Sequence, residues 1–233
     1  MESEQVTIRL KKDHYVVDAV FHFFNDAEQT TEWVGFPKYG HGVTSDKDIV
    51  DFQWFEAWVD GRKTLFVEEG DAFSGVDRLL RPDGVHKHFS KYRWMVHKVT
   101  FPALAETTMR VRYAAHYSRG GSAYYLYGTG RYWKGTIGTA VFIIDCADVG
   151  GRDKVSVECV SKFEREVLSK DLLRYEIRDV EPSPGEEIGA VVEAIRKARE
   201  FHPPARAIRV LKRAPTDIKG EPDKPLHAPV NSP

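Results

Sequence analysis

The sequence has little net charge and no long apolar run. Its 34 basic and 35 acidic side chains nearly cancel, which leaves a formal net charge of −1. Proteins that bind nucleic acid usually carry a clear basic excess to neutralise phosphates, so this balance argues against a nucleic-acid partner. No stretch approaches the roughly 18 consecutive apolar residues that a membrane-spanning helix needs.

The sequence also has no recognisable leader and few cysteines. The start, Met-Glu-Ser-Glu-Gln-Val, lacks the charged-then-apolar pattern of a signal peptide, so we expect a cytosolic chain or one whose leader has been removed. The two cysteines, Cys146 and Cys159, flank a turn-like segment at Gly150-Gly151. A simple hairpin there sets Cys159 opposite about Ile143, so a disulfide would need a bulge. We predict two small buried thiols instead.

Motifs of catalysis and phosphate binding are missing as well. There is no Gly-x-Ser-x-Gly elbow and no local pairing of a nucleophile with a base, which predicts a protein that is not an enzyme and uses no cofactor. Gly128-x-Gly130 resembles a phosphate loop only superficially, because a strand follows it where a phosphate loop needs a helix. We expect these two glycines to supply positive φ at a turn or bulge.

Alternation of apolar and polar residues dominates the chain. It is clearest over residues 15–23 and 109–117. This period of two is typical of half-buried strands, and turn signals such as Asp60-Gly61 and Gly120-Gly121 separate the segments. Strands spaced in this way, with little helix between them, predict an all-β fold, an antiparallel β-sandwich, over residues 1–182.

The C-terminal part has a different pattern. Ser183-Pro184-Gly185-Glu186 has the residues of a capping box, and apolar residues then recur at helical spacing from Ile188 to Ala198. This pattern predicts one amphipathic helix over residues 183–202, packed on the sandwich. Seven of the 12 prolines follow from Pro203 onward, which predicts an extended tail or linker over residues 203–233.

The most unusual segment runs from residue 124 to residue 138, where four tyrosines, a tryptophan and four glycines fall within fifteen positions. Exposed rings at such a corner can stack on sugars, as aromatic side chains do in carbohydrate-binding sandwiches. The candidate ligand-binding residues are therefore Tyr124, Tyr127, Tyr132 and Trp133. The alternative, which we favour, is a structural corner that joins two strands.

A metal site is a further alternative. His86-Lys87-His88 places two imidazoles on one face of a predicted strand, and His97 or His22 could complete a site for a metal-dependent hydrolase. No cysteine or carboxylate at diagnostic spacing supports this reading. Exposed strand histidines explain the same pattern.

Several blocks resemble a known family. They are Phe23-Phe24-Asn25, Gly35-Phe36-Pro37, and the run Thr129-Gly130-Arg131-Tyr132-Trp133-Lys134-Gly135-Thr136-Ile137-Gly138. The succession is similar to a bacterial and archaeal family of secreted β-rich domains of unknown function, over about Glu2 to Glu181. The resemblance implies an extracytoplasmic location (periplasmic, cell-surface or secreted) and supplies no catalytic residues. The chain departs from the family in lacking a leader and in carrying the predicted helix and tail.

Together these features predict a non-catalytic module of the cell envelope. We expect it to act in protein interaction or as a structural spacer, with an unknown protein or glycan as partner. Membrane association would come only through a removed leader or anchor. A carbohydrate-binding module that uses the aromatic corner and, last, a metal-dependent hydrolase are the alternatives.

Overall fold

A computed structural model describes residues 1–38, 52–69, 94–118, 120–159, 162–182 and 187–201. These described residues are mostly β, with 66% strand and 9% helix, which confirms the β-rich prediction. Met1–Pro203 form one compact unit, and the residues from Pro204 onward lie outside the described part of the chain. No helix in the described part of the chain is long and apolar enough to span a membrane.

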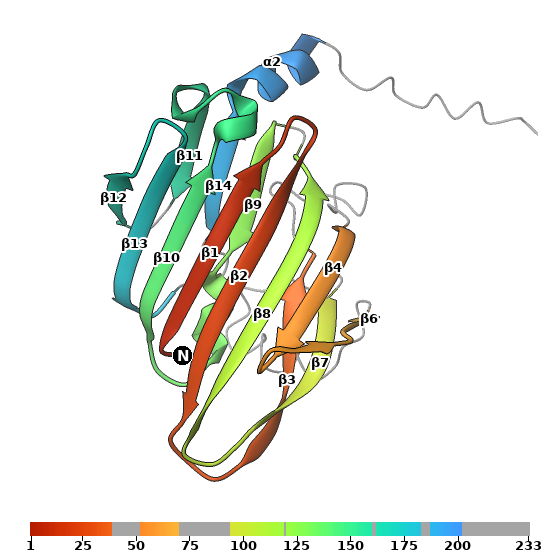
Figure 1. Cartoon of the computed structure of the whole chain (residues 1–233), viewed down its shortest axis with the longest axis vertical. Helices are drawn as coiled ribbons and strands as arrows, with labels where there is room; N and C mark the ends of the chain where they lie inside the picture. The colour runs from red at the N-terminus through yellow and green to blue at the C-terminus, as the bar shows by residue number, and fades with distance from the viewer. Residues whose placement is uncertain (39–51, 70–93, 119, 160–161, 183–186, 202–233) are drawn as a thin grey trace, which may run out of the picture. The chain divides into compact units, whose positions relative to one another are not determined.

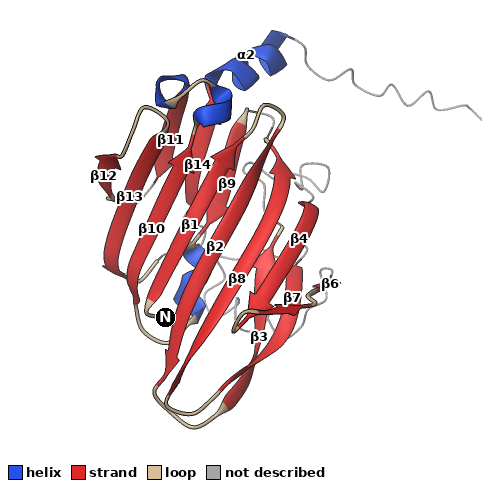
Figure 2. Cartoon of the chain, viewed as in Figure 1, coloured by secondary structure: helices blue, strands red, loops and turns tan. Residues whose placement is uncertain are grey.

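One large sheet organises the compact unit (Figures 1 and 2). Its long central strands carry the alternating segments that the sequence shows, and the buried positions of β1 are Glu4, Val6, Ile8 and Leu10. The strand order is β12 (Glu164–Val167), β13 (Leu172–Val180), β10 (Ile137–Asp145), β1 (Ser3–Leu10), β2 (His14–Asn25), β8 (Ala105–His116), β4 (Phe52–Val59) and β5 (Arg62–Thr64).

The pairing of β1 with β10 is parallel, which corrects the prediction of purely antiparallel sheets. All other described pairs in the large sheet are antiparallel. Short turns force antiparallel neighbours, but β1 and β10 are far apart in sequence, so no turn sets their direction. Gly138 permits the close approach at the start of this pair, because a Cβ there would lie 2.6 Å from the carbonyl oxygen of Glu2.

Two smaller sheets cover the inner face of the large sheet. One consists of β11 (Val155–Cys159), β14 (Glu187–Val192) and β9 (Ser122–Leu126), and the other of β3 (Thr30–Pro37), β7 (Trp94–Phe101) and β6 (Val67–Glu69). Tyr125 of β9 packs 6.0 Å from Phe142 of β10, and Phe36 of β3 packs 5.5 Å from Phe21 of β2, measured between ring centroids. All three sheets therefore share one apolar core.

The C-terminal helix is shorter than predicted. Helix α2 covers only Glu193–Phe201, and the predicted first turns form strand β14 instead. Ile188, Ala190 and Val192 lie in the core at every second position of β14, as expected for a strand, and Val191 between them is also buried. Ile188 and Val192 also fit a helical period, which is why the pattern was misleading. The predicted cap at residues 183–186 lies outside the described residues.

The predicted roles of two glycines and one cysteine also need correction. Positive φ occurs at Gly135, Gly150 and Gly151, and not at Gly128 or Gly130. The latter two lie in the 3-10 turn η2 (Gly128–Tyr132), which follows β9. Two further 3-10 turns, η3 (Ala147–Val149) and η4 (Arg152–Lys154), precede β11. Both cysteines are free. Cys146 is buried as predicted, whereas Cys159, predicted to be buried, is exposed on β11.

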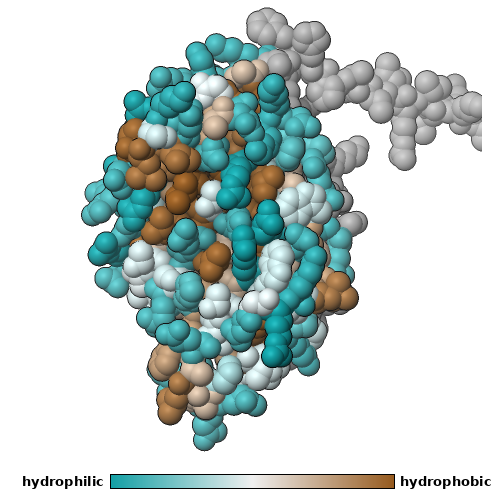
Figure 3. Space-filling view, in the orientation of Figure 1, coloured by the Kyte–Doolittle hydropathy of each residue, from teal (hydrophilic) through white to brown (hydrophobic). Residues whose placement is uncertain are grey.

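The outer face of the large sheet is polar over its centre (Figure 3). Asp18 of β2 lies between three arginines and accepts two hydrogen bonds from Arg110, at 2.8 and 2.7 Å. Arg9 and Arg112 lie 3.7 and 3.5 Å from the same carboxylate. This face is the solvated side of the alternation, opposite to the core.

Candidate functional site

A cavity of about 690 Å³ lies between the large sheet and the sheet β3-β7-β6. Its walls come from the start of β1, the end of β2, strands β3 and β7, Met109 of β8, and the segment from Tyr127 to Gly135. The volume falls within the range of about 300–1,000 Å³ that is usual for small-molecule sites. The cavity is therefore large enough for a ligand.

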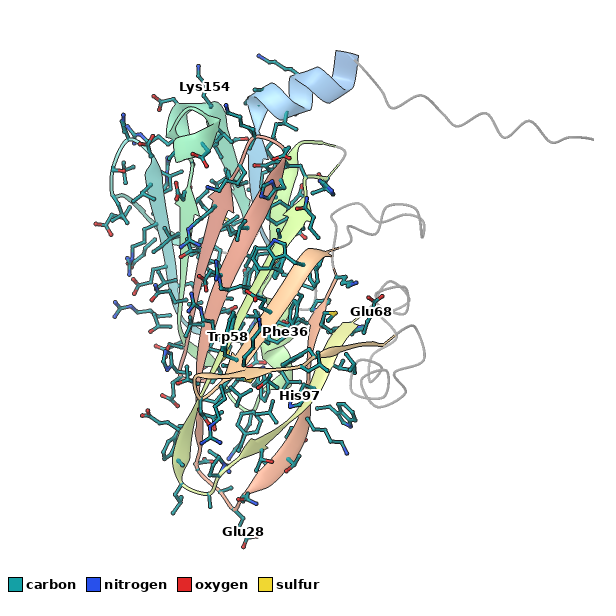
Figure 4. All side chains as sticks on the ribbon, turned by 45° about the vertical axis from the view of Figure 1, so that its right-hand side comes forward. Glu28, Phe36, Trp58, Glu68, His97 and Lys154 are labelled. Atoms are coloured by element: carbon teal, nitrogen blue, oxygen red, sulfur yellow. The ribbon has the colours of Figure 1, made fainter. Side chains whose placement is uncertain are left out.

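Aromatic rings form much of the wall. Phe21 and Phe23 point to the same side of β2 because side chains alternate along a strand. Phe23 lies 4.5 Å from Trp133 and 5.6 Å from Phe101, between ring centroids. Phe36, which is labelled in Figure 4, contacts Phe21 and also packs against Phe55 and Phe66 behind it. These contacts fix the rings that face the cavity.

The turn that joins β2 to β3 is held by Asn25, next to Glu28 at the tip shown in Figure 4. The Asn25 amide nitrogen lies 2.9–3.1 Å from the carbonyl oxygens of Glu28, Phe101 and Pro102, and its Oδ1 accepts a hydrogen bond from the Ala27 backbone N–H at 3.2 Å. These bonds tie the end of β2 to the end of β7, which fixes one rim of the cavity.

Gly35 makes room for a cavity residue on the neighbouring strand. A Cβ at Gly35 would lie 3.1 Å from Cε3 of Trp94, which is tighter than an ordinary contact. Trp94 is 6% exposed and lines the cavity. The glycine in the Gly35-Phe36-Pro37 block therefore serves the packing of Trp94 against β3.

Glu4 is the unusual group of the site. It lines the cavity, yet it is only 2% exposed and stands on the apolar face of β1 beside Val6. Its Oε1 accepts a short hydrogen bond from the Tyr125 hydroxyl. Burial raises the pKa of Glu4 from its ordinary 4.5 to about 7, although the hydrogen bond from Tyr125 opposes the rise.

Three exposed carboxylates also line the cavity. They belong to Glu2, Asp26 and Glu32. Asp26 is paired with Lys134, whose Nζ lies 3.1–3.2 Å from both carboxylate oxygens. Glu32 accepts a hydrogen bond from the hydroxyl of Thr30 at 2.5 Å.

The four aromatic residues predicted to bind a ligand do not all lie at the cavity. Tyr127 and Trp133 line the cavity, with Tyr127 1% exposed and Trp133 half-buried. Tyr124 is 6% exposed and lies beside Gly189 of β14, where a Cβ would come within 2.5 Å of its ring. The side chain of Tyr132 is outside what the structure describes. Two of the four candidates therefore meet at one cavity.

The predicted metal-binding residues His86 and His88 lie outside the described residues. Their suggested partners are described: the His97 ring packs 5.3 Å from the Phe66 ring, and His22 lies 3.4 Å from the Thr108 hydroxyl. Within the described ranges, no three His, Cys, Asp or Glu side chains stand close enough together to hold a metal ion.

Sequence reasoning missed Glu4, although a signal was present. Alternation in β1 puts Val6, Ile8 and Leu10 on the buried face, and the same period puts Glu4 there too. A carboxylate on an apolar face is rarely fully buried, so this position marks an unusual environment. The sequence could not show that Tyr125, 121 residues away, donates to it.

Comparisons with known proteins give a fold and no family. No protein-family model and no curated protein matches the chain, which is in line with an uncharacterised family. A solved structure from Legionella pneumophila, with the provisional description of a nutrient binding protein, is similar at a TM-score of 0.59 and 15% identity. The match covers 86% of this chain and 69% of that one. At this identity the likeness concerns the fold.

Weaker matches are to larger proteins. An M1 zinc metallopeptidase from Deinococcus radiodurans aligns at a TM-score of 0.41 and 9% identity, over 82% of this chain and 41% of that one. This chain thus spans less than half the length of that enzyme.

The arrangement at the cavity is suited to binding. Aromatic rings supply a large apolar contact area, and a few polar groups at fixed positions can orient a ligand. Glu4 adds a carboxyl group that can be neutral or ionised near neutral pH, because its pKa is about 7.

Proposed function

We propose that this chain is a non-catalytic binding module that takes a small molecule with an apolar body into the aromatic cavity. The observation that carries the proposal is the 690 Å³ cavity itself, walled by Phe21, Phe23, Phe101 and Trp133. Folded proteins fill most interior space, and large apolar cavities with a few convergent polar groups are the usual form of a ligand site.

The cavity favours a ligand-binding role over that of a structural spacer. A spacer gains stability from a filled interior, whereas lining a cavity of this size with large rings forgoes packing contacts. Interaction with a protein partner remains compatible with ligand binding, because the outer face of the large sheet is not used by the cavity. The three sheets are best classed, in our proposal, as a β-sandwich with one parallel strand pair.

Two further observations agree with this role. The Legionella structure of similar fold carries a provisional nutrient-binding description. The resemblance to secreted β-rich domains suggests an extracytoplasmic location, which we retain as part of the proposal. Cell fractionation of the source organism would check the location, because recovery in the cytosol would contradict it.

The binding role is tested with the uncharged fluorescent probe N-phenyl-1-naphthylamine, whose emission rises in apolar sites. We expect saturable binding at one site per chain. Val34→Phe should weaken binding by about tenfold or more, because Val34 is 4% exposed and lines the cavity, so a larger ring occupies the space of the probe. Trp133→Leu, which removes a wall ring, is a second variant.

The matched control is Val16→Phe on β2. Its side chain is only partly buried and lies on the outer face of the large sheet, away from the cavity. It should bind the probe as the wild type does, and thermal melting of each variant establishes that it is folded. Absence of saturable binding, or equal binding by folded Val34→Phe and wild type, would contradict the proposal. Binding of free sugars in place of the apolar probe would favour the carbohydrate alternative.

A further inference from the structure

Carboxylates outnumber cationic groups in the described lining of the cavity. Four side chains are carboxylates (Glu2, Glu4, Asp26 and Glu32), against the ammonium of Lys134 and the α-amino group of Met1. Lys134 is already paired with Asp26. Among the described residues no ion pair joins Glu2, Glu4 or Glu32 to a basic side chain, so the excess of carboxylates in the described lining favours a positively charged ligand over a negatively charged one.

Glu4 is the most buried of these carboxylates, and only one of its two oxygens accepts a hydrogen bond from a described residue. Tyr125 donates to Oε1, and among the described residues no group donates to Oε2. An ionised carboxylate has about four acceptor positions, so Glu4 can accept further hydrogen bonds from a molecule in the cavity. At 98% burial, that acceptor is reachable only from the cavity that Glu4 lines.

The aromatic rings near Glu4 also favour a positively charged ligand. Phe21 pairs with Glu4 across β1 and β2, and Phe23 and Trp133 stand next along the wall. The faces of aromatic rings carry partial negative charge and attract ammonium groups, with Trp the strongest. Carboxylates and ring faces therefore act together on one class of ligand.

We propose that the ligand of this cavity is an organic cation, an apolar or aromatic body that carries an ammonium group directed to the carboxylate of Glu4. This inference rests on the binding role proposed above and names the class of molecule bound. The ammonium would donate to Oε2 while Tyr125 keeps its bond to Oε1. The apolar body would contact the rings of Phe21, Phe23 and Trp133.

Protonation of Glu4 should control this binding. The groups that face Glu4 are the hydroxyl of Tyr125 on β9 and, electrostatically, Tyr113 on β8, both of which stay neutral because burial raises their pKa well above 10. Glu2 and Glu32 are further carboxylates of the cavity lining, and Met1 brings its α-amino group to the same lining. The cation therefore binds more tightly as the pH rises through about 7, where Glu4 loses its proton.

The test uses three probes with one indole body: tryptamine, a cation; tryptophol, which is neutral; and indole-3-propionate, an anion. Isothermal titration calorimetry measures each affinity at about pH 6, 7 and 8. We expect tryptamine to bind about tenfold or more tightly than tryptophol at pH 8, and the anion to bind most weakly. The preference for tryptamine over tryptophol should grow about tenfold from pH 6 to 8.

Glu4→Gln keeps the size of the side chain and removes its charge. It should reduce the preference for tryptamine over tryptophol to within about threefold and abolish its pH dependence. Glu164→Gln, an exposed position on β12 outside the cavity, is the matched control and should change neither quantity. Thermal melting confirms that both variants are folded.

Three outcomes would overturn this inference. They are equal affinity of tryptamine and tryptophol in the wild type, an unchanged preference in Glu4→Gln, and binding of N-phenyl-1-naphthylamine without binding of any of the indoles. The binding role itself stands in each of these cases as long as the apolar probe N-phenyl-1-naphthylamine still binds. Failure of all probes, including the apolar one, would remove the binding role itself.

Discussion

Glu4 gives a prediction about stability that needs no ligand. Its carboxyl is buried in the folded state, and its pKa is about 7 there against an ordinary 4.5. A raised pKa means that the folded state holds the proton more tightly than the unfolded state. The stability that the protonated Glu4 contributes to the folded state is fully present below pH 4.5 and is lost as the pH rises through about 7.

The size of the effect follows from the two pKa values. The difference between 4.5 and about 7 corresponds to about 3–4 kcal/mol, since each pKa unit is worth about 1.4 kcal/mol. Glu4→Gln removes the ionisation, and the amide oxygen can still accept the hydrogen bond from the Tyr125 hydroxyl. We therefore expect the variant and the wild type to unfold within about 1 kcal/mol of each other at about pH 5. At about pH 8.5 the variant should be more stable by about 2–3 kcal/mol.

The measurement is urea unfolding of both proteins at a series of pH values between about 5 and 8.5, followed by tryptophan fluorescence. Groups that titrate in both proteins cancel in the difference, so the difference isolates Glu4. Glu164→Gln serves as the control and should show no trend with pH. A difference that stays constant over this range, or a variant that is less stable than the wild type at pH 8.5, would refute the burial argument.

Three further predictions concern other parts of the fold. Asp18→Asn should destabilise the protein by about 1–3 kcal/mol in urea unfolding, because it removes the charge that holds three arginines together on the outer face, and an unchanged midpoint would show that those ion pairs are fully screened. Gly189→Ala should cost about 1–3 kcal/mol, since its Cβ would lie 2.5 Å from the Tyr124 ring, and a neutral effect would show that this ring moves freely. A thiol reagent should label Cys159 in the folded protein and Cys146 only after unfolding, as counted by mass spectrometry, because Cys146 is buried and burial raises the pKa of its thiol to about 11. Rapid labelling of both cysteines would contradict the buried position of Cys146.

The strands were predictable where alternation is regular and local. Residues 15–23 and 109–117 alternate without interruption, and they lie in β2 (His14–Asn25) and β8 (Ala105–His116). Each of these strands buries one face and exposes the other, so the period in the sequence directly reports the period of burial. The β-rich class follows from such segments.

The sequence was misleading where a pattern fits two periods or where partners are remote. Ile188 and Val192 satisfy both a helix and a strand, and the pairing of β14 with β9, about 65 residues earlier, decides in favour of the strand. The parallel pairing of β1 with β10 was equally invisible, because it joins residues more than 130 positions apart. Tertiary contacts override local preference at both places.

The candidate site was predictable in part. The aromatic segment from Tyr124 onward drew attention to Tyr127 and Trp133, which line the cavity. The opposite wall could not be foreseen, because Phe21, Phe23 and Phe101 look like ordinary core residues in their strands. Only the folded chain shows that these rings surround an unfilled volume.

The aromatic segment also explains why a buried carboxylate can be tolerated. Its first part, strand β9, supplies the Tyr125 hydroxyl that satisfies one oxygen of Glu4, and its later part supplies Trp133 to the cavity wall. A buried polar group costs free energy unless it is hydrogen-bonded. The bond from Tyr125 therefore offsets part of the cost of burying Glu4 beside the cavity. Gly130 assists by leaving room for Ile137, whose Cδ1 would lie 2.6 Å from a Cβ at that position. The tyrosines and the tryptophan of this segment thus serve the cavity: Tyr125 binds the buried carboxylate, and Tyr127 and Trp133 line the wall. A simple turn between two strands would need none of these side chains.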